Sequence, residues 1–191
     1  MMRLIILLVL LGGGLMASGQ HVLAASASEQ RRVEIGLKIF RATLAADQQL
    51  SRKLDPQQHL LIVLFYGHEA SAAKRYRQHL AQPGGLLKYS LHIVLSNNPT
   101  LSEFSTTPPA AIFITEPRLP LATLQRLQSF SIRHNCLLFS PFEADVKRGV
   151  AAGLFIGARV EPYVNAKALQ ASGLELQNFF LSIAKQLDSE L

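Results

Sequence analysis

The densest group of charged and polar side chains in this sequence directly follows an apolar run and could bind a polar ligand or a protein partner. Phe142, Glu143, Asp145 and Arg148 lie within ten residues of the run at positions 136–139. Carboxylates and a guanidinium offer hydrogen-bond acceptors and donors to a polar ligand. The carboxyl ends of parallel strands are where doubly wound sheets form their binding crevices. The other interpretation is a surface helical turn, because residues three apart on a helix are neighbours and can pair.

A second polar stretch contains Arg159, Tyr163 and Asn165. Tyrosine and arginine are enriched at the energetic centres of protein interfaces, so these residues are further candidates for contact with a partner or ligand. Strand residues of these types also form ordinary cross-strand pairs, and an asparagine can cap a helix. The sequence leaves both interpretations open.

No motif for catalysis or for a bound cofactor is found. The patterns Gly-x-Ser-x-Gly, Gly-x-x-x-x-Gly-Lys and His-Glu-x-x-His do not occur. His68 and Glu69 are adjacent rather than spaced for a shared metal, and the other histidines are scattered. No nucleophile is matched with a base either. We therefore expect a protein that is not an enzyme, with no catalytic residues, no cofactor and no metal.

The first 24 residues predict a secretory signal peptide. Arg3 precedes an uncharged apolar run from Leu4 to Met16, and Val22-Leu23-Ala24 has the small-residue pattern of a cleavage site. The run of about 13 residues is shorter than the roughly 20 that cross a bilayer as a helix. We therefore expect cleavage after Ala24 and a soluble, exported, periplasmic protein that does not insert into the membrane afterwards. A second small-residue site at positions 25–27 leaves the exact cut uncertain.

Length and charge set limits on the rest of the chain. Cleavage would leave 167 of the 191 residues, the usual size of one domain, so we expect a single α/β domain over residues 25–191. The whole chain has 19 basic and 13 acidic residues and a formal net charge of +6. Because these charges are scattered and the protein is expected to be exported, nucleic acid is not an expected partner.

Cys136 is the only cysteine, so no internal disulfide can form. Its neighbours Leu137, Leu138 and Phe139 favour a buried apolar residue, as free cysteines commonly are. The alternative is an exposed thiol that links two subunits of a homodimer.

Hydrophobic patterns predict an alternation of helices and strands. A stripe formed by Val33, Leu37, Phe40 and Leu44 predicts a first helix over residues 29–50. Apolar runs predict strands at residues 59–66, 89–95, 110–115 and 136–139, with helical segments over 73–82, near 100–104 and from 120. The run at 59–66 is continuously apolar, as in a strand covered on both faces. The alternation predicts a mostly parallel sheet flanked by helices, a Rossmann-like three-layer arrangement.

The pattern changes after Pro141. Residues 153–164 predict two short strands or one bent strand, and Pro162 favours an edge position, so we expect an antiparallel edge near the C-terminus. Asn165 predicts the start of a short helix that ends near Gly173. A last stripe predicts a final helix, with its apolar side chains at Leu176, Phe180, Ile183 and Leu187.

Three segments near the end of the chain carry a specific pattern. Gly153–Asn165 holds two predicted strands and an Asn, Ala168–Leu174 ends in a small-residue-Gly-Leu step, and Ala184-Lys185 lies in the predicted last helix. In order and spacing, from about Cys136 onward, this pattern resembles the YfiR/HmsC-like family of periplasmic regulatory proteins. Before Cys136 the resemblance is diffuse.

The resemblance implies a regulatory rather than a catalytic role. Proteins of this family repress a membrane-bound diguanylate cyclase by contacting its periplasmic sensor domain, which lowers cyclic-di-GMP and biofilm output. The chain departs from the family pattern in two ways. Its single cysteine, Cys136, cannot form the paired-cysteine redox bridge of better-known members. The Trp-Pro step that often ends the first helix in the family is also missing. This chain has no Trp and reads Ala45-Ala46-Asp47-Gln48 there.

Two functions follow from the sequence. The first is an exported regulator that binds the sensor region of an inner-membrane signalling protein, either a diguanylate cyclase or a sensor kinase. The alternative is a small-ligand binding module related to one lobe of periplasmic solute-binding proteins, because Lys147–Gly153 also resembles a late strand-turn of those folds. Such proteins close two lobes around a ligand, so a single lobe would need a second chain to complete the cleft.

Overall fold

The computed structural model describes residues 16–187, and the chain divides into two compact units, residues 1–31 and 32–191. The first 15 residues of the predicted signal peptide lie outside the described residues. Helix α1 (Met16–Ala45) belongs to the second unit from Arg32 onward. Among the helices of residues 16–187, none combines the length and the apolar character that a membrane span requires. The second unit carries the sheet.

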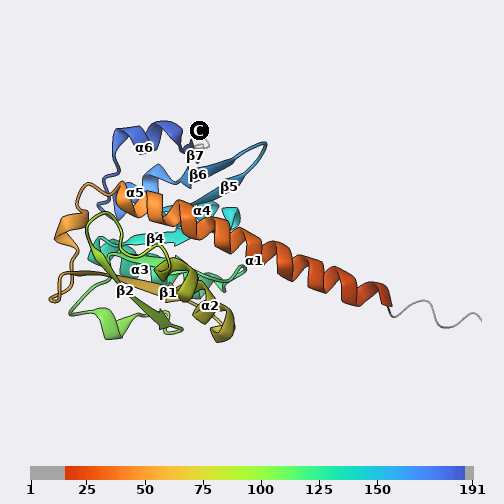
Figure 1. Cartoon of the computed structure of the whole chain (residues 1–191). Coiled ribbons are helices and arrows are strands. Elements are labelled where there is room, and N and C mark those ends of the chain that lie inside the picture. Colours follow the sequence, from red (N-terminus) through yellow and green to blue (C-terminus); the bar gives the residue numbers. More distant parts are fainter. Residues whose placement is uncertain (1–15, 188–191) are drawn as a thin grey trace, which may run out of the picture. The chain divides into compact units, whose positions relative to one another are not determined.

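The described residues of the second unit form seven strands in one mixed sheet (Figure 1). The strands are β1 (His59–Phe65), β2 (Ser90–Ser96), β3 (Ala111–Ile114), β4 (Leu137–Ser140), β5 (Ala152–Ile156), β6 (Val160–Val164) and β7 (Lys185–Gln186). Their order is β2-β1-β3-β4-β5-β6-β7. All neighbours are parallel except β5 and β6, which are antiparallel. The prediction of a mostly parallel α/β sheet is confirmed.

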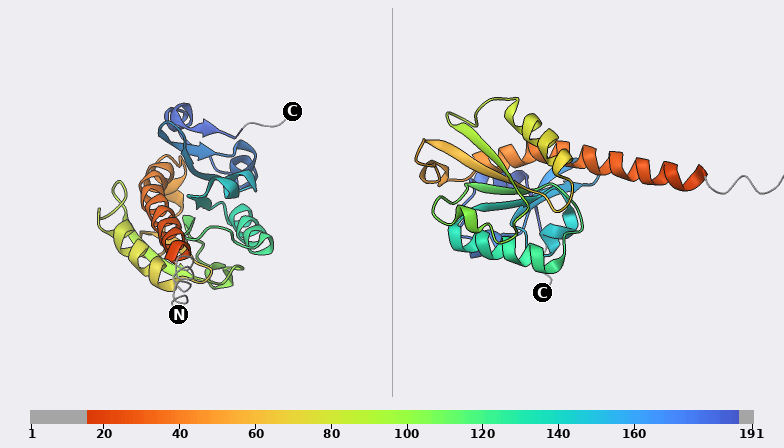
Figure 2. Two further views of the ribbon diagram at one scale, coloured as in Figure 1. Left: turned by 90° about the vertical axis from the view of Figure 1, so that its right-hand side faces the viewer. Right: turned by 90° about the horizontal axis from the view of Figure 1, so that it is seen from below.

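The helices lie on both faces of this sheet (Figure 2). Besides α1 they are α2 (Ala70–Ala81), α3 (Leu121–His134), α4 (Glu143–Lys147), α5 (Ala166–Ala171) and α6 (Asn178–Ile183), with 3-10 turns η1 (Leu50–Arg52) and η2 (Ser102–Phe104). Side chains of α1 and α2 pack with one face of β1, β3 and β4, and side chains of α3 pack with the other face. The predicted three layers are therefore present.

The apolar patterns of the early elements are confirmed by burial. Val33, Leu37, Phe40 and Leu44 are each at most 4 % exposed, so the stripe of α1 faces the sheet. Strand β1 is buried from Leu60 to Phe65, on both faces. The first helix ends earlier than predicted, at Ala45.

The predicted antiparallel edge near the C-terminus is confirmed, but it contains one strand more than expected. The antiparallel pair β5–β6 is not the last pair, because β7 adds to the outer side of β6 at Tyr163 and Val164. The backbone N–H of Leu187 continues this pairing with a hydrogen bond of 2.8 Å to the Val164 oxygen. The edge strands are therefore β2 and β7.

The predicted final helix is wrong in its extent. Leu176 lies before α6, in an antiparallel bridge to Asp47, and residues 185–186 form β7. The backbone is held out of the helix by bonds from Gln177 N to Ala46 O and from Gln48 N to Glu175 O, both 2.9 Å long. Lys185, which the family pattern places on a terminal helix, lies in a strand here, and Ile183 is half exposed.

Candidate functional site

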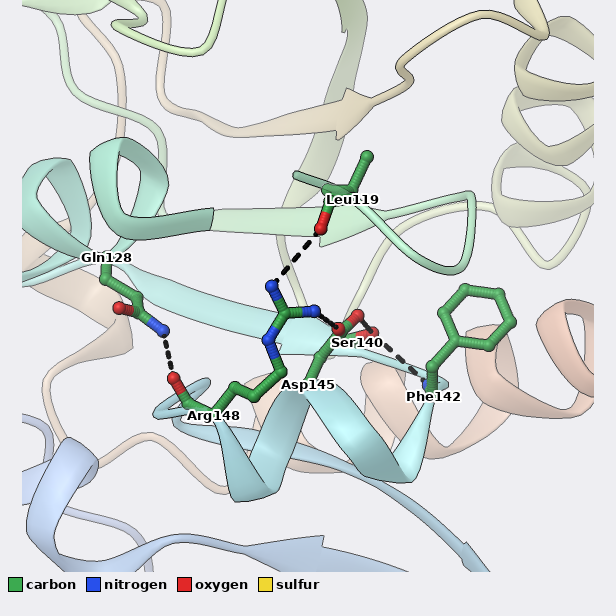
Figure 3. A network of polar contacts seen from close by, with 6 residues as sticks. All are labelled: Leu119, Gln128, Ser140, Phe142, Asp145 and Arg148. Carbon is green, nitrogen blue, oxygen red and sulfur yellow. Dashed lines mark hydrogen bonds and ion pairs between the residues drawn. The ribbon is translucent and has the colours of Figure 1, made fainter. Parts of the chain in front are cut away.

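The predicted polar group lies at the carboxyl end of β4, where the chain turns into α4. Ser140, the last residue of β4, accepts a hydrogen bond from the Phe142 N–H at 3.2 Å and donates its hydroxyl to Asp145 Oδ2 at 2.7 Å (Figure 3). Asp145 is only 1 % exposed. Burial raises the pKa of the Asp145 carboxyl, while the Ser140 hydroxyl and the Arg148 guanidinium act in the opposite direction.

Arg148 connects this turn to the neighbouring loop. Its Nη1 lies 3.5 Å from Asp145 Oδ1, and its Nη2 donates to the Leu119 oxygen in the loop between β3 and α3 at 3.2 Å. Gln128 of α3 donates to the Arg148 oxygen at 2.7 Å. The predicted pairing of Asp145 with Arg148 is confirmed. Figure 3 shows that it belongs to a network linking the β4–α4 turn to the β3–α3 loop and to α3.

A small pocket of about 290 Å³ opens beside this network. Its lining contains all four residues predicted in the first polar group, which are Phe142, Glu143, Asp145 and Arg148. The rest of the lining is Ala144 of the same segment, together with Arg32, Pro117 and Arg118 from other parts of the chain. Three arginines from three parts of the chain therefore meet at the carboxyl end of β4.

Arg32 reaches the pocket because α1 passes very close to the β4–α4 turn. A Cβ added to Gly36 would lie 2.6 Å from Pro141 Cβ, so a larger residue could not occupy this position without a shift. One helical turn before Gly36, Arg32 Nη1 lies 3.5 Å from the Pro141 oxygen. Arg118 comes from the loop after β3 and has a left-handed backbone, with φ 59°.

The crevice between β1 and β3 is occupied by the chain itself. Strand β1 has β2 on one side and β3 on the other, so this is the switch point where doubly wound sheets bind ligands. The backbone N–H groups of His68 and Glu69, just before α2, donate to the Glu116 carboxylate at 3.0 and 2.6 Å. An anion is favourable at a helix N-terminus, and here Glu116 supplies it. The pocket beside β4 is therefore the better candidate on this edge.

The second predicted group does not join the first as a set. Arg159 is exposed at the β5–β6 turn and pairs with Glu161 Oε1 at 2.8 Å. Tyr163 is buried, with its ring 5.8 Å from that of Phe155. Asn165 caps α5 as predicted, because its side chain accepts from Ala168 N at 3.0 Å. A surface ion pair, a buried ring contact and a helix cap therefore account for Arg159, Tyr163 and Asn165 respectively.

A larger groove lies on the α3 side, between α3, α4, α5 and β7. Its volume is about 920 Å³, and its lining includes Glu143, Tyr163 and Asn165 from the predicted residues, but not Arg159. Three lysines also line it, at positions 147, 167 and 185. Lys147 Nζ is paired with Glu143 Oε1 at 2.7 Å, and Lys185 Nζ lies 4.0 Å from the centre of the Phe155 ring.

Sequence reasoning missed Arg32 and Arg118. The rule that selected the residues after β4 applies equally to the residues after β3, so Arg118 could have been found by it. Arg32 carries no such signal, because it reaches the pocket from a helix that precedes the whole sheet. Only the close approach of Gly36 to Pro141 brings it there.

The remaining reactive groups do not add to this site. Cys136 is buried, and burial raises the pKa of its thiol to about 12, which confirms the interpretation as a buried apolar residue. Within residues 16–187, no group of three or more His, Cys, Asp or Glu side chains is placed to hold a metal ion. The pocket offers guanidinium donors and a small apolar wall, which suit recognition of a polar group.

Comparison with known proteins gives information on the fold. No family model matches the chain, and no curated protein matches it. Among solved structures, a ligand-free, open substrate-binding protein with adhesive properties from Clostridium difficile matches with TM-score 0.53 and 10 % identity, over 74 % of this chain and 58 % of that one. At this identity the match shows a shared α/β fold.

Two further structures match less well. One is an ABC domain in complex with L-Trp from Streptococcus pneumoniae, with TM-score 0.46 and 13 % identity over 76 % of this chain and 60 % of that one. The other is a conserved domain protein from Vibrio cholerae O1 biovar El Tor, with TM-score 0.49 and 10 % identity over 73 % and 58 %. This chain spans about three fifths of each of the three proteins.

Proposed function

We propose that the protein is a small-ligand binding module whose site is the pocket beside β4. The observation that carries the proposal is the pocket itself, in which charged side chains from α1, the β3–α3 loop and α4 meet at the carboxyl edge of a parallel sheet. The network of Ser140, Asp145 and Arg148 fixes one wall of this pocket. Structure similarity to a substrate-binding protein is consistent with such a role.

The pocket, of about 290 Å³, is small for a complete binding site, since typical ligand sites hold about 300–1,000 Å³ and enclose most of the ligand. Substrate-binding proteins enclose ligands by closing two domains around them. We propose that this chain supplies one wall and that a second copy supplies the other. No catalytic step is part of the proposal, because the pocket lining has no nucleophile with a base beside it.

A thermal-shift screen with neutral, cationic and anionic metabolites tests the proposal. A ligand that binds the folded state stabilises it by RT ln(1 + [L]/Kd), about 2.7 kcal/mol at 100 times Kd. Ala144 is exposed and lines the pocket, so Ala144→Phe should fill the pocket and remove the shift. Ala166→Phe is the matched control, because Ala166 is also exposed but lines the larger groove. A shift abolished by Ala166→Phe instead, or no shift with any compound, would reject the proposal.

A second candidate is the regulator that binds the sensor region of an inner-membrane signalling protein. Ile156 and Val160 pair across the β5–β6 hairpin, and both are about 40 % exposed. Phe179 and Ile183 of α6 are more exposed still. Exposed apolar side chains on a hairpin could contact a partner protein. The measurement is cyclic-di-GMP in a deletion strain complemented with the wild type or with Val160→Asp. Equal levels in the deletion and both complemented strains would contradict this candidate.

A further inference from the structure

We infer that the ligand of the pocket beside β4 is a small oxyanion, a carboxylate or phosphate group, held by Arg32 and Arg148. The inference rests on the proposed function and specifies its ligand class. Guanidinium groups are the preferred partners of carboxylate and phosphate, because their planar N–H donors match two oxygens at once.

The charges that line the pocket are not balanced. Besides Arg118, the lining holds two arginines, Arg32 and Arg148, and two carboxylates, those of Glu143 and Asp145. Glu143 is already paired with Lys147, whose ammonium group lies 2.7 Å from it. Arg32 and Arg148 therefore face one remaining carboxylate of the lining, that of Asp145, and the excess positive charge attracts an anion into a partly closed site.

The second carboxylate is already engaged within the fold. Asp145 is almost completely buried, its Oδ2 accepts the Ser140 hydroxyl, and its Oδ1 lies 3.5 Å from Arg148 Nη1. Asp145 therefore positions the Arg148 guanidinium, which also donates to the Leu119 oxygen from its other nitrogen. An arginine fixed in this way loses little freedom when it binds an anion.

Arg32 of α1 lines the pocket together with Arg148, which follows α4. Its polar contact is the Pro141 oxygen at 3.5 Å, a long distance to an uncharged acceptor. An anion offers this guanidinium shorter and charge-assisted hydrogen bonds. The apolar side chains of Pro117 and Phe142 lie in the same lining and could contact the body of the ligand. The volume of about 290 Å³ limits that body to a small one.

The test is calorimetric titration of the purified protein with inorganic phosphate and, separately, with acetate. Binding of either anion should weaken at least tenfold in Arg32→Gln and should weaken as salt is raised, because charges attract less in salt. Arg159→Gln is the matched control, since Arg159 is exposed and lies outside this pocket. An unchanged melting temperature of ligand-free Arg32→Gln would show that the variant folds.

The outcomes separate this inference from the proposed function. If the metabolite screen finds a neutral or cationic ligand that Ala144→Phe abolishes, the pocket binds a ligand but the oxyanion inference is wrong. The same holds if an anion binds equally well to Arg32→Gln. If no compound binds at all, both the proposed function and the inference fail.

Discussion

At the scale of single residues, the carboxyl edge shows two carboxylates in different surroundings. Glu116 accepts backbone N–H groups at the start of α2 and fills the switch point. Asp145 is buried behind Ser140 and orients Arg148. The first closes the position where ligands bind in related sheets, and the second supports the arginine that faces the neighbouring pocket. Glu116 is therefore held by backbone N–H groups, whereas Asp145 is held by the side chains of Ser140 and Arg148.

A third carboxylate, Asp55, links stability to pH. It is 5 % exposed, and its Oδ1 accepts from the N–H groups of His59 and Gln57 at 2.8 and 3.0 Å. The His59 N–H bond is the largest cause that lowers the pKa of Asp55 below 3.8. Burial opposes it, and the Gln57 N–H and the imidazoles of His59 and His92 add to the lowering. Because the folded-state value is depressed, the stabilisation is present above about pH 4 and is lost as the pH falls through the folded value.

We therefore expect Asp55→Asn to lower the melting temperature at neutral pH and to lose this difference in acid. The measurement is the melting temperature of both proteins between roughly pH 7 and pH 2.5, a range that spans the carboxyl titration. Glu175→Gln is the control, since Glu175 is exposed. A difference between wild type and Asp55→Asn that stays constant over the whole range would show that the charge of Asp55 is not involved.

The sequence predicts some residues of the pocket lining but not others. The residues after β4 were found because a polar group that follows a buried strand is visible in the sequence. Glu116 and Arg118 follow β3 in the same way, but they are fewer and lie next to Pro117. Arg32 could not be found, because its place depends on a contact between residues more than a hundred positions apart.

At the scale of elements, the packing of α1 on the β4–α4 turn shapes the pocket. Gly36 lies against Pro141, and Arg32 is one turn away on the same side of the helix. In an ordinary helix position, Gly→Ala stabilises by roughly 1 kcal/mol. A forced overlap in a packed region costs about 1–3 kcal/mol instead. For Gly36→Ala, the helix propensity therefore predicts a gain in stability, and the contact with Pro141 predicts a loss.

We expect Gly36→Ala to destabilise the protein by up to about 2 kcal/mol in urea unfolding, because the overlap outweighs the helix propensity. Pro141→Gly removes the Cβ that Gly36→Ala would meet. In the double variant the two changes should therefore be non-additive, with Pro141→Gly relieving part of the loss. A gain in stability for Gly36→Ala alone would contradict the close approach of α1 to this turn.

The elements also show where a sequence pattern is sufficient and where it is not. The stripe of α1 and the runs of β1, β3 and β4 were predictable, because each buries its own apolar residues against the sheet. The stripe that begins at Leu176 has the same spacing but is divided between a bridge, α6 and Leu187, the residue that follows β7. The backbone of this segment pairs with Ala46, Gln48 and Val164. The periodicity of apolar side chains does not predict backbone hydrogen bonds to residues that are distant in the sequence.

At the scale of the second unit as a whole, the sheet is buried on both faces by two separate apolar clusters. The first contains the rings of Phe40, Phe113 and Phe139, whose centres lie 5.3–5.5 Å apart. The second contains Phe65 and Phe130, packed on the α3 side. Phe40 is the aromatic contact between α1 and this sheet, and it is completely buried. The attachment of α1, and with it the place of Arg32, thus depends on Phe40.

Phe40→Ala should lower the free energy of unfolding by about 3–5 kcal/mol, because it removes a large buried side chain and leaves a cavity between α1 and the sheet. The matched control is Phe179→Ala, since Phe179 is 73 % exposed and should change stability by less than about 0.5 kcal/mol. Urea unfolding gives both values, and an unchanged m-value would show that the same surface is exposed. Phe40→Leu provides a milder truncation if Phe40→Ala does not fold. Equal losses at positions 40 and 179 would mean that α1 is not anchored to the sheet by this ring.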